Sequence, residues 1–117
     1  MTSTAPSRRR VLVVEDELMI RMLLEDMLTE LGYGIAATAG RLDEAMQVAH
    51  TMVFDVAILD VNLNGQPISP VADALAGRGL PFIFATGYDE DGIPDIYRDR
   101  PMLKKPFQLD SLRRTLE

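Results

Sequence analysis

Val56-Ala57-Ile58-Leu59 is an unbroken apolar run that ends in Asp60, and Val11-Leu12-Val13-Val14 is a second run that ends in Glu15-Asp16. Continuous runs of this length are typical of strands buried on both faces of a parallel sheet. Because the carboxyl ends of parallel strands open on one edge, three acidic side chains are expected close together. Carboxylates at that range repel one another, so one must take up a proton or the group must bind a cation. Oxygen ligands without histidine or cysteine favour Mg²⁺ over zinc.

The rest of the chain alternates between strand and helix patterns. Expected strands are Val11–Val14, Tyr33–Thr38, Phe54–Leu59, Pro81–Ala85 and Met102–Lys104, and expected helices run over Ile20–Leu31, Leu42–Ala49, from Ser69-Pro70 to Ala76, and over Leu109–Leu116. The segment 62–65, Asn-Leu-Asn-Gly, is predicted as a loop. Strands that alternate with helices through short connections predict a doubly wound α/β fold with a five-stranded parallel sheet.

The segment 87–101 is the weakest part of this pattern. It contains two glycines, two prolines and an acidic cluster, and only Ile93, Ile96 and Tyr97 could form an apolar face. We therefore expect the fourth helix to be short or irregular.

Length and composition indicate one domain. The 117 residues suffice for a single core, which we place at 10–117, and residues 1–9 are expected to form a disordered N-terminal tail. No segment approaches the roughly 20 apolar residues of a membrane span, and the N-terminus has no secretory signal pattern. The absence of cysteine excludes disulfides and thiolate metal sites and is consistent with a cytoplasmic location.

Charge argues against nucleic acid as the main partner. The net charge is −6, and the small basic groups Arg8-Arg9-Arg10 and Arg113-Arg114 are expected to be solvated charges. The single histidine, His50, lies at the end of the second expected helix and is interpreted as a surface residue. Acidic and hydroxyl side chains must therefore carry any chemistry.

Polar and charged residues follow the expected strands at the edge where these strands end. Glu15 and Asp16 supply an acid pair, Asp60 a lone carboxylate, Thr86 a hydroxyl and Lys105 a cation. Each has an ordinary structural explanation alone: a helix N-cap for Asp16, a turn aspartate, a strand-end threonine bonded to backbone, and a solvated loop lysine. Their joint position at one sheet edge favours a functional site, and a metal-loaded acidic pocket with one lone aspartate suggests phosphoryl chemistry.

Four motifs give the chain a family resemblance: Val-Val-Glu-Asp-Glu (13–17), Ile-Leu-Asp-Val-Asn-Leu (58–63), Phe-Ala-Thr-Gly-Tyr (84–88) and Lys-Lys-Pro-Phe (104–107). Over about 10–116 the chain resembles the receiver domain of two-component response regulators. This resemblance implies a flavodoxin-like fold with strand order 2-1-3-4-5. The Phe-Ala-Thr-Gly-Tyr motif resembles that of stand-alone receivers with an altered fourth helix.

The resemblance also implies roles for single residues. Asp60 looks like the phospho-acceptor, Thr86 like the hydroxyl that bonds the phosphoryl group, and Lys105 like its cationic partner. It further implies Mg²⁺ held by Glu15, Asp16, Asp60 and the backbone carbonyl of Asn62. Typical receivers have an aromatic switch residue three positions before the lysine, where this chain has Met102, so Tyr88 is a candidate substitute.

The resemblance implies a phosphoprotein that accepts a phosphoryl group from a sensor histidine kinase and signals to a downstream protein or relays the group. It would be a phospho-acceptor with self-catalysed transfer and dephosphorylation, not an enzyme, and a monomer or weak dimer. One alternative is a receiver-like protein-binding module that works without phosphorylation. A second is a phosphatase of the haloacid dehalogenase type, which needs an acid two residues after the nucleophile, where this chain has Asn62.

Overall fold

The computed structural model describes residues 9–87 and 93–116, so the predicted tail at 1–9 lies outside the described residues except for Arg9. The strands of the main sheet are β1 (Arg10–Val14), β2 (Gly34–Ala39), β3 (Val56–Asp60), β6 (Phe82–Thr86) and β7 (Met102–Lys104). They pair in the order β2-β1-β3-β6-β7, and every pair is parallel. The predicted five-stranded sheet with order 2-1-3-4-5 is confirmed, and strand ends lie within two residues of the predicted ones.

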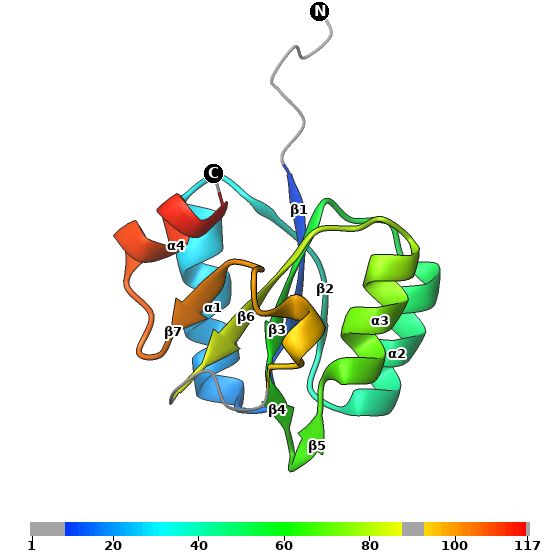
Figure 1. The fold of residues 1–117 in the computed structure, drawn as a ribbon. Coiled ribbons are helices and arrows are strands. Elements are labelled where there is room, and N and C mark those ends of the chain that lie inside the picture. Colours follow the sequence, from blue (N-terminus) through cyan, green and yellow to red (C-terminus); the bar gives the residue numbers. More distant parts are fainter. Residues whose placement is uncertain (1–8, 88–92, 117) are drawn as a thin grey trace, which may run out of the picture.

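Helices cover both faces of this sheet (Figure 1). On one face lie α1 (Leu18–Glu30) and α4 (Leu109–Leu116), and on the other lie α2 (Leu42–Thr51) and α3 (Ser69–Gly77). Alternate residues of each strand point to opposite faces, so Val11 and Val13 of β1 join the core under α1 and α4 while Leu12 joins the core under α2 and α3. The strands β1, β3 and β6 are almost entirely buried, which explains why their sequences are nearly continuous apolar runs.

A small hairpin follows β3 where the sequence predicted a loop. Its strands are β4 (Asn62–Leu63) and β5 (Gln66–Pro67), which pair antiparallel. The turn residues Asn64 and Gly65 both have positive φ, at 53° and 79°, which is the geometry that an Asn-Gly pair favours in a two-residue turn. The loop prediction was wrong for these strands because two residues are too few to show a periodicity.

The predicted irregular fourth helix is a single 3₁₀ turn, η1 (Asp95–Tyr97), in the described part of that segment. The ring of Tyr97 packs edge-on against Phe82, with centroids 5.3 Å apart, and its hydroxyl donates a hydrogen bond of 2.5 Å to the Asp73 carboxylate of α3. Ile93 and Tyr97 are buried, but Ile96 is 76% exposed, so its predicted place on the apolar face was wrong. Three residues make too short a turn for a helical face.

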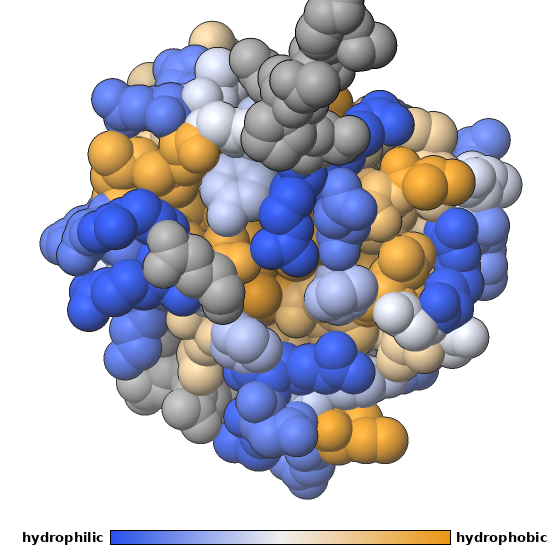
Figure 2. Space-filling view, turned by 90° about the horizontal axis from the view of Figure 1, so that it is seen from above, coloured by the Kyte–Doolittle hydropathy of each residue, from blue (hydrophilic) through white to orange (hydrophobic). Residues whose placement is uncertain are grey.

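One end of the molecule has a surface of mixed character. Figure 2 looks at the end opposite the hairpin, where hydrophilic side chains cover much of the face and hydrophobic ones are interspersed. Within residues 9–87 and 93–116, no helix has the length and apolar character needed to cross a membrane.

Candidate functional site

Strand register gathers the predicted site residues at one edge of the sheet. Val14 of β1 pairs with Leu59 of β3, so the residues that follow them, Glu15 and Asp60, lie side by side. Asp60 in turn pairs with Ala85, the residue before Thr86. The backbone N–H of Lys105 donates to the carbonyl oxygen of Thr86 at 2.8 Å, which brings the fifth strand to the same edge. All the strands that carry a predicted site residue therefore contribute to one site.

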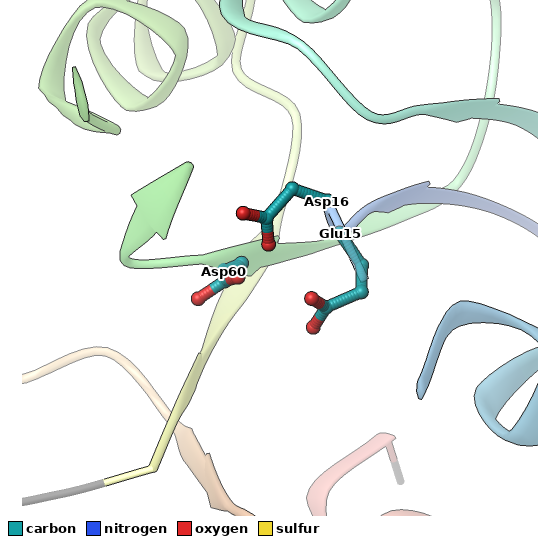
Figure 3. A group of neighbouring side chains, drawn as sticks. All are labelled: Glu15, Asp16 and Asp60. Atoms are coloured by element: carbon teal, nitrogen blue, oxygen red, sulfur yellow. The ribbon is translucent and has the colours of Figure 1, made fainter. Parts of the chain in front are cut away.

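Three carboxylates form the centre of this site (Figure 3). Glu15, Asp16 and Asp60 each offer an oxygen within 4.8 Å of the others. Glu15 and Asp60 are buried and Asp16 is half-buried. Lys105 partly offsets their charge, because its Nζ lies 2.8 Å from Oε1 of Glu15 and 3.4 Å from Oδ2 of Asp60. The cluster places three acidic groups beside one lysine, so the site is suited to a further cation.

Backbone N–H groups hold the carboxylates in place. Glu17 N–H donates to Glu15 at 3.1 Å and Asn64 N–H donates to Asp16 at 3.0 Å. Asp16 is therefore not the N-cap of α1: Glu17 holds that position, and no side-chain cap bond is formed. Helix capping therefore does not explain Asp16, which instead belongs to the acidic cluster.

The pKa of Asp60 is shifted in the opposite direction from that of the neighbouring Asp16. Burial, followed by repulsion from Glu15, raises the pKa of Asp60 from 3.8 to about 7 even though Lys105 opposes the change. Partial burial disfavours the ionised Asp16, but the Asn64 N–H and hydrogen bonds with Asp60 and Glu15 outweigh it and lower the pKa of Asp16. Burial disfavours the charged Lys105 too, yet its bond to Glu15 raises the pKa of Lys105 overall.

The raised pKa of Asp60 predicts a pH-dependent stability in metal-free protein. Between about pH 4 and pH 7 the folded chain keeps a proton that the unfolded chain has lost, so this group's contribution to stability falls as pH rises, and levels off above about 7. Asp60→Asn removes the effect. At pH 8 we expect the variant to have a free energy of unfolding about 1–2 kcal/mol above wild type, allowing for solvent in an open pocket.

Urea unfolding in the presence of a chelator measures this difference. The gap between variant and wild type should widen from pH 4.5 to pH 8 and narrow when Mg²⁺ is added. The exposed Asp26→Asn change on α1 is the control and should give no such pH-dependent gap. A constant gap for Asp60→Asn across this range would contradict the raised pKa of Asp60.

An open cavity of about 650 Å³ gives access to the cluster. Its lining includes Asp16, Asp60, Asn62, Thr86 and Lys105. Thr86 is buried at the end of β6, and Asn62 is exposed, with its N–H directed at Asp60 over 3.4 Å. The Asn62 carbonyl as a metal ligand stays a prediction. The switch candidate Tyr88 lies outside the described residues, and Met102 is partly buried beside Phe84 on the neighbouring strand.

The donor set fits Mg²⁺. All candidate ligands are oxygens, the cluster holds more acidic than basic groups, and burial together with Glu15 raises the pKa of Asp60. The sequence analysis did not identify Asn64, whose N–H donates a hydrogen bond to Asp16, as part of this site. The Asn-Gly pair signalled a turn, but nothing in the sequence placed that turn against a residue 48 positions away.

Comparisons with known proteins agree on this architecture. A family model described as the response regulator receiver domain matches residues 11–117. The transcriptional regulatory protein PdtaR of Mycobacterium tuberculosis is 34% identical over 93% of this chain and 55% of its own length, so the chain spans about half of that curated relative. The solution structure of SdrG from Sphingomonas melonis Fr1 is 43% identical, with a TM-score of 0.84 over 93% of both chains. The BeF3-activated conformation of SdrG from Pseudomonas melonis Fr1 is 44% identical, with a TM-score of 0.79 over 94% of this chain and 95% of that one.

Proposed function

Because the chain belongs to the response regulator receiver domain family of two-component systems, we propose that it accepts a phosphoryl group on Asp60 and uses the change to signal. The observation that carries this proposal is the environment of Asp60. Its carboxylate lies beside Glu15 and Lys105 and lines the open cavity together with Thr86. An aspartate placed in this way combines access with charge stabilisation, which phosphoryl transfer requires.

The transfer follows from the chemistry of these side chains. A carboxylate oxygen of Asp60 attacks the phosphorus of a phosphohistidine, a P–O bond forms, and the P–N bond breaks with its electron pair left on the imidazole nitrogen. Lys105, already 3.4 Å from Oδ2 of Asp60, offers a positive charge to a phosphoryl oxygen, and Thr86 offers a hydroxyl donor. Bound Mg²⁺, held by Glu15, Asp16 and Asp60, would neutralise charge on the acceptor and on the incoming oxygens.

Two features of the chain weigh against the alternatives. The residue two positions after Asp60 is Asn62, which cannot protonate a leaving group, so a phosphatase of the haloacid dehalogenase type lacks its general acid here. The existence of a BeF3-activated conformation of a relative 44% identical supports a function that depends on the phosphorylated state. We therefore favour a phospho-acceptor over both an enzyme and a phosphorylation-independent binding module.

A sensor histidine kinase as donor and a protein as downstream partner are part of this proposal, as are a cytoplasmic location and a monomeric or weakly dimeric state. Met102 leaves β7 without an aromatic, so Tyr88 is proposed to move with Thr86. An unchanged amide-shift response of Tyr88→Ala to beryllofluoride would reject that role.

The experiment that tests the function uses acetyl phosphate as a small phosphoryl donor. Wild-type protein incubated with acetyl phosphate and Mg²⁺ should gain the mass of one phosphoryl group, and the gain should disappear slowly as water hydrolyses the acyl phosphate. The same incubation with a chelator in place of Mg²⁺ should give little or no gain. Equal gain with and without the metal would contradict the proposed role of the acidic cluster.

A further inference from the structure

The β4–β5 hairpin begins two residues after Asp60 and turns at Asn64-Gly65. Its flanking pair is Leu63 with Gln66, and the backbone groups of such a pair close a two-residue hairpin. The N–H of Asn64, the first turn residue, is not needed for that closure. It is therefore available to bond a group outside the hairpin.

Asn64 makes two bonds to distant parts of the chain. Its backbone N–H donates to Oδ2 of Asp16 at 3.0 Å, and its side-chain amide donates to the carbonyl oxygen of Gly40 at 3.2 Å. Gly40 itself lies against the backbone of the acid pair, since a Cβ there would lie 3.7 Å from the Glu15 carbonyl oxygen and 4.0 Å from Cα of Asp16. One residue thus ties the hairpin both to a candidate metal ligand and to the loop behind that ligand.

Most residues of the hairpin are exposed. Asn62, Leu63, Gln66 and Pro67 form its strands, and of these only Leu63 is buried. A cavity of about 450 Å³, lined in part by Gln66 and by Met46 of α2, separates the turn from that helix. The side-chain bond from Asn64 to Gly40 therefore anchors the exposed turn to a distant part of the chain.

We propose that Asn64 is a positioning residue that fixes the Asp16 carboxylate for Mg²⁺ binding. The Gly40 bond holds the turn, and the turn presents its N–H to one oxygen of Asp16, which leaves the second oxygen for the cation. Turn preference alone explains an Asn with positive φ, but it does not explain two bonds that span 48 and 24 residues. This inference rests on the proposed function, because it requires that the acidic cluster binds the metal.

The test removes the side-chain bond between Asn64 and Gly40 while preserving the turn. Asn64→Gly retains the N–H and adopts positive φ without strain, but it removes the bond to Gly40. Titration with Mg²⁺ alone, followed by backbone amide shifts, should show a dissociation constant about three- to tenfold weaker than wild type. Melting of the metal-free variant should change little, because the turn is exposed. Gln66→Ala, in the same hairpin and beside the same cavity, should bind Mg²⁺ like wild type.

A double variant distinguishes an effect of Asn64 on the position of Asp16 from a non-specific loss of structure. Asp16→Asn should lose most Mg²⁺ affinity, and adding Asn64→Gly to it should cause no further loss if Asn64 acts through Asp16. Equal Mg²⁺ affinity of Asn64→Gly and wild type would overturn this inference while leaving the proposed function intact. A loss of metal-free stability with unchanged affinity would also overturn it. If wild type bound no Mg²⁺ and accepted no phosphoryl group, the proposed function would fall as well.

Discussion

Asp60→Asn is expected to abolish phosphoryl incorporation from acetyl phosphate, with a rate at least about a thousandfold below wild type. An amide has the shape of the carboxylate but is not a nucleophile, so the acyl phosphate cannot form at this position. Intact mass over time measures the effect. Because the same change should make the metal-free fold more stable, unfolding is not the expected cause of the lost incorporation.

The control for this prediction is Asp26→Asn, an exposed change of the same chemistry on α1, which should incorporate the group at the wild-type rate. Full incorporation by Asp60→Asn would mean that another residue accepts the group. The neighbouring carboxylates Glu15 and Asp16 would then be the first candidates, since their oxygens lie within 4.8 Å of Asp60.

Lys105→Ala should weaken the binding of a phosphoryl-like group while leaving phosphoryl transfer to Asp60 possible. The Lys105 ammonium lies between Glu15 and Asp60, at 2.8 Å and 3.4 Å, and its side chain is only 16% exposed. Its loss removes one charge-assisted bond to a phosphoryl oxygen, so the affinity for beryllofluoride should fall by about ten- to a hundredfold. Incorporation from acetyl phosphate should remain measurable, because Asp60 is still present, while the amide-shift response should weaken.

Lys104→Ala is the matched control. Lys104 is the preceding residue, pairs with Thr86 across the sheet and is exposed, whereas Lys105 faces the acids. We expect it to bind beryllofluoride like wild type. A Lys105→Ala variant indistinguishable from Lys104→Ala in affinity and in amide shifts would contradict the role assigned to Lys105.

The sequence predicted the sheet and most of the site because both depend on strong local signals. Two apolar runs that end in acids are sufficient to place Glu15, Asp16 and Asp60 at one edge, and a parallel sheet then adds Thr86 and Lys105. Burial, together with the acid repulsion expected from that arrangement, raises the pKa of Asp60. Each of these inferences needs only strand polarity and residue type.

What escaped prediction depends on contacts between segments far apart in the chain. The β4–β5 hairpin has strands of two residues, too short to show a period, and the bond of Asn64 to Asp16 joins loops that no local pattern relates. Tyr97 is similar, because its burial follows from Phe82 on β6 and from Asp73 on α3, not from a helical face of its own. These contacts orient side chains whose approximate positions in the fold can be predicted from the sequence.

The most direct measurement of the central claim is the chemical location of the phosphoryl group. Wild-type protein treated with acetyl phosphate and Mg²⁺ is reduced with borohydride, which converts an acyl phosphate into an alcohol, then digested and sequenced by mass spectrometry. We predict that the reduced residue is Asp60, and that untreated protein shows no reduction there. Reduction at Glu15 or Asp16, or a phosphoryl group that resists borohydride because it sits on a hydroxyl such as that of Thr86, would contradict the account.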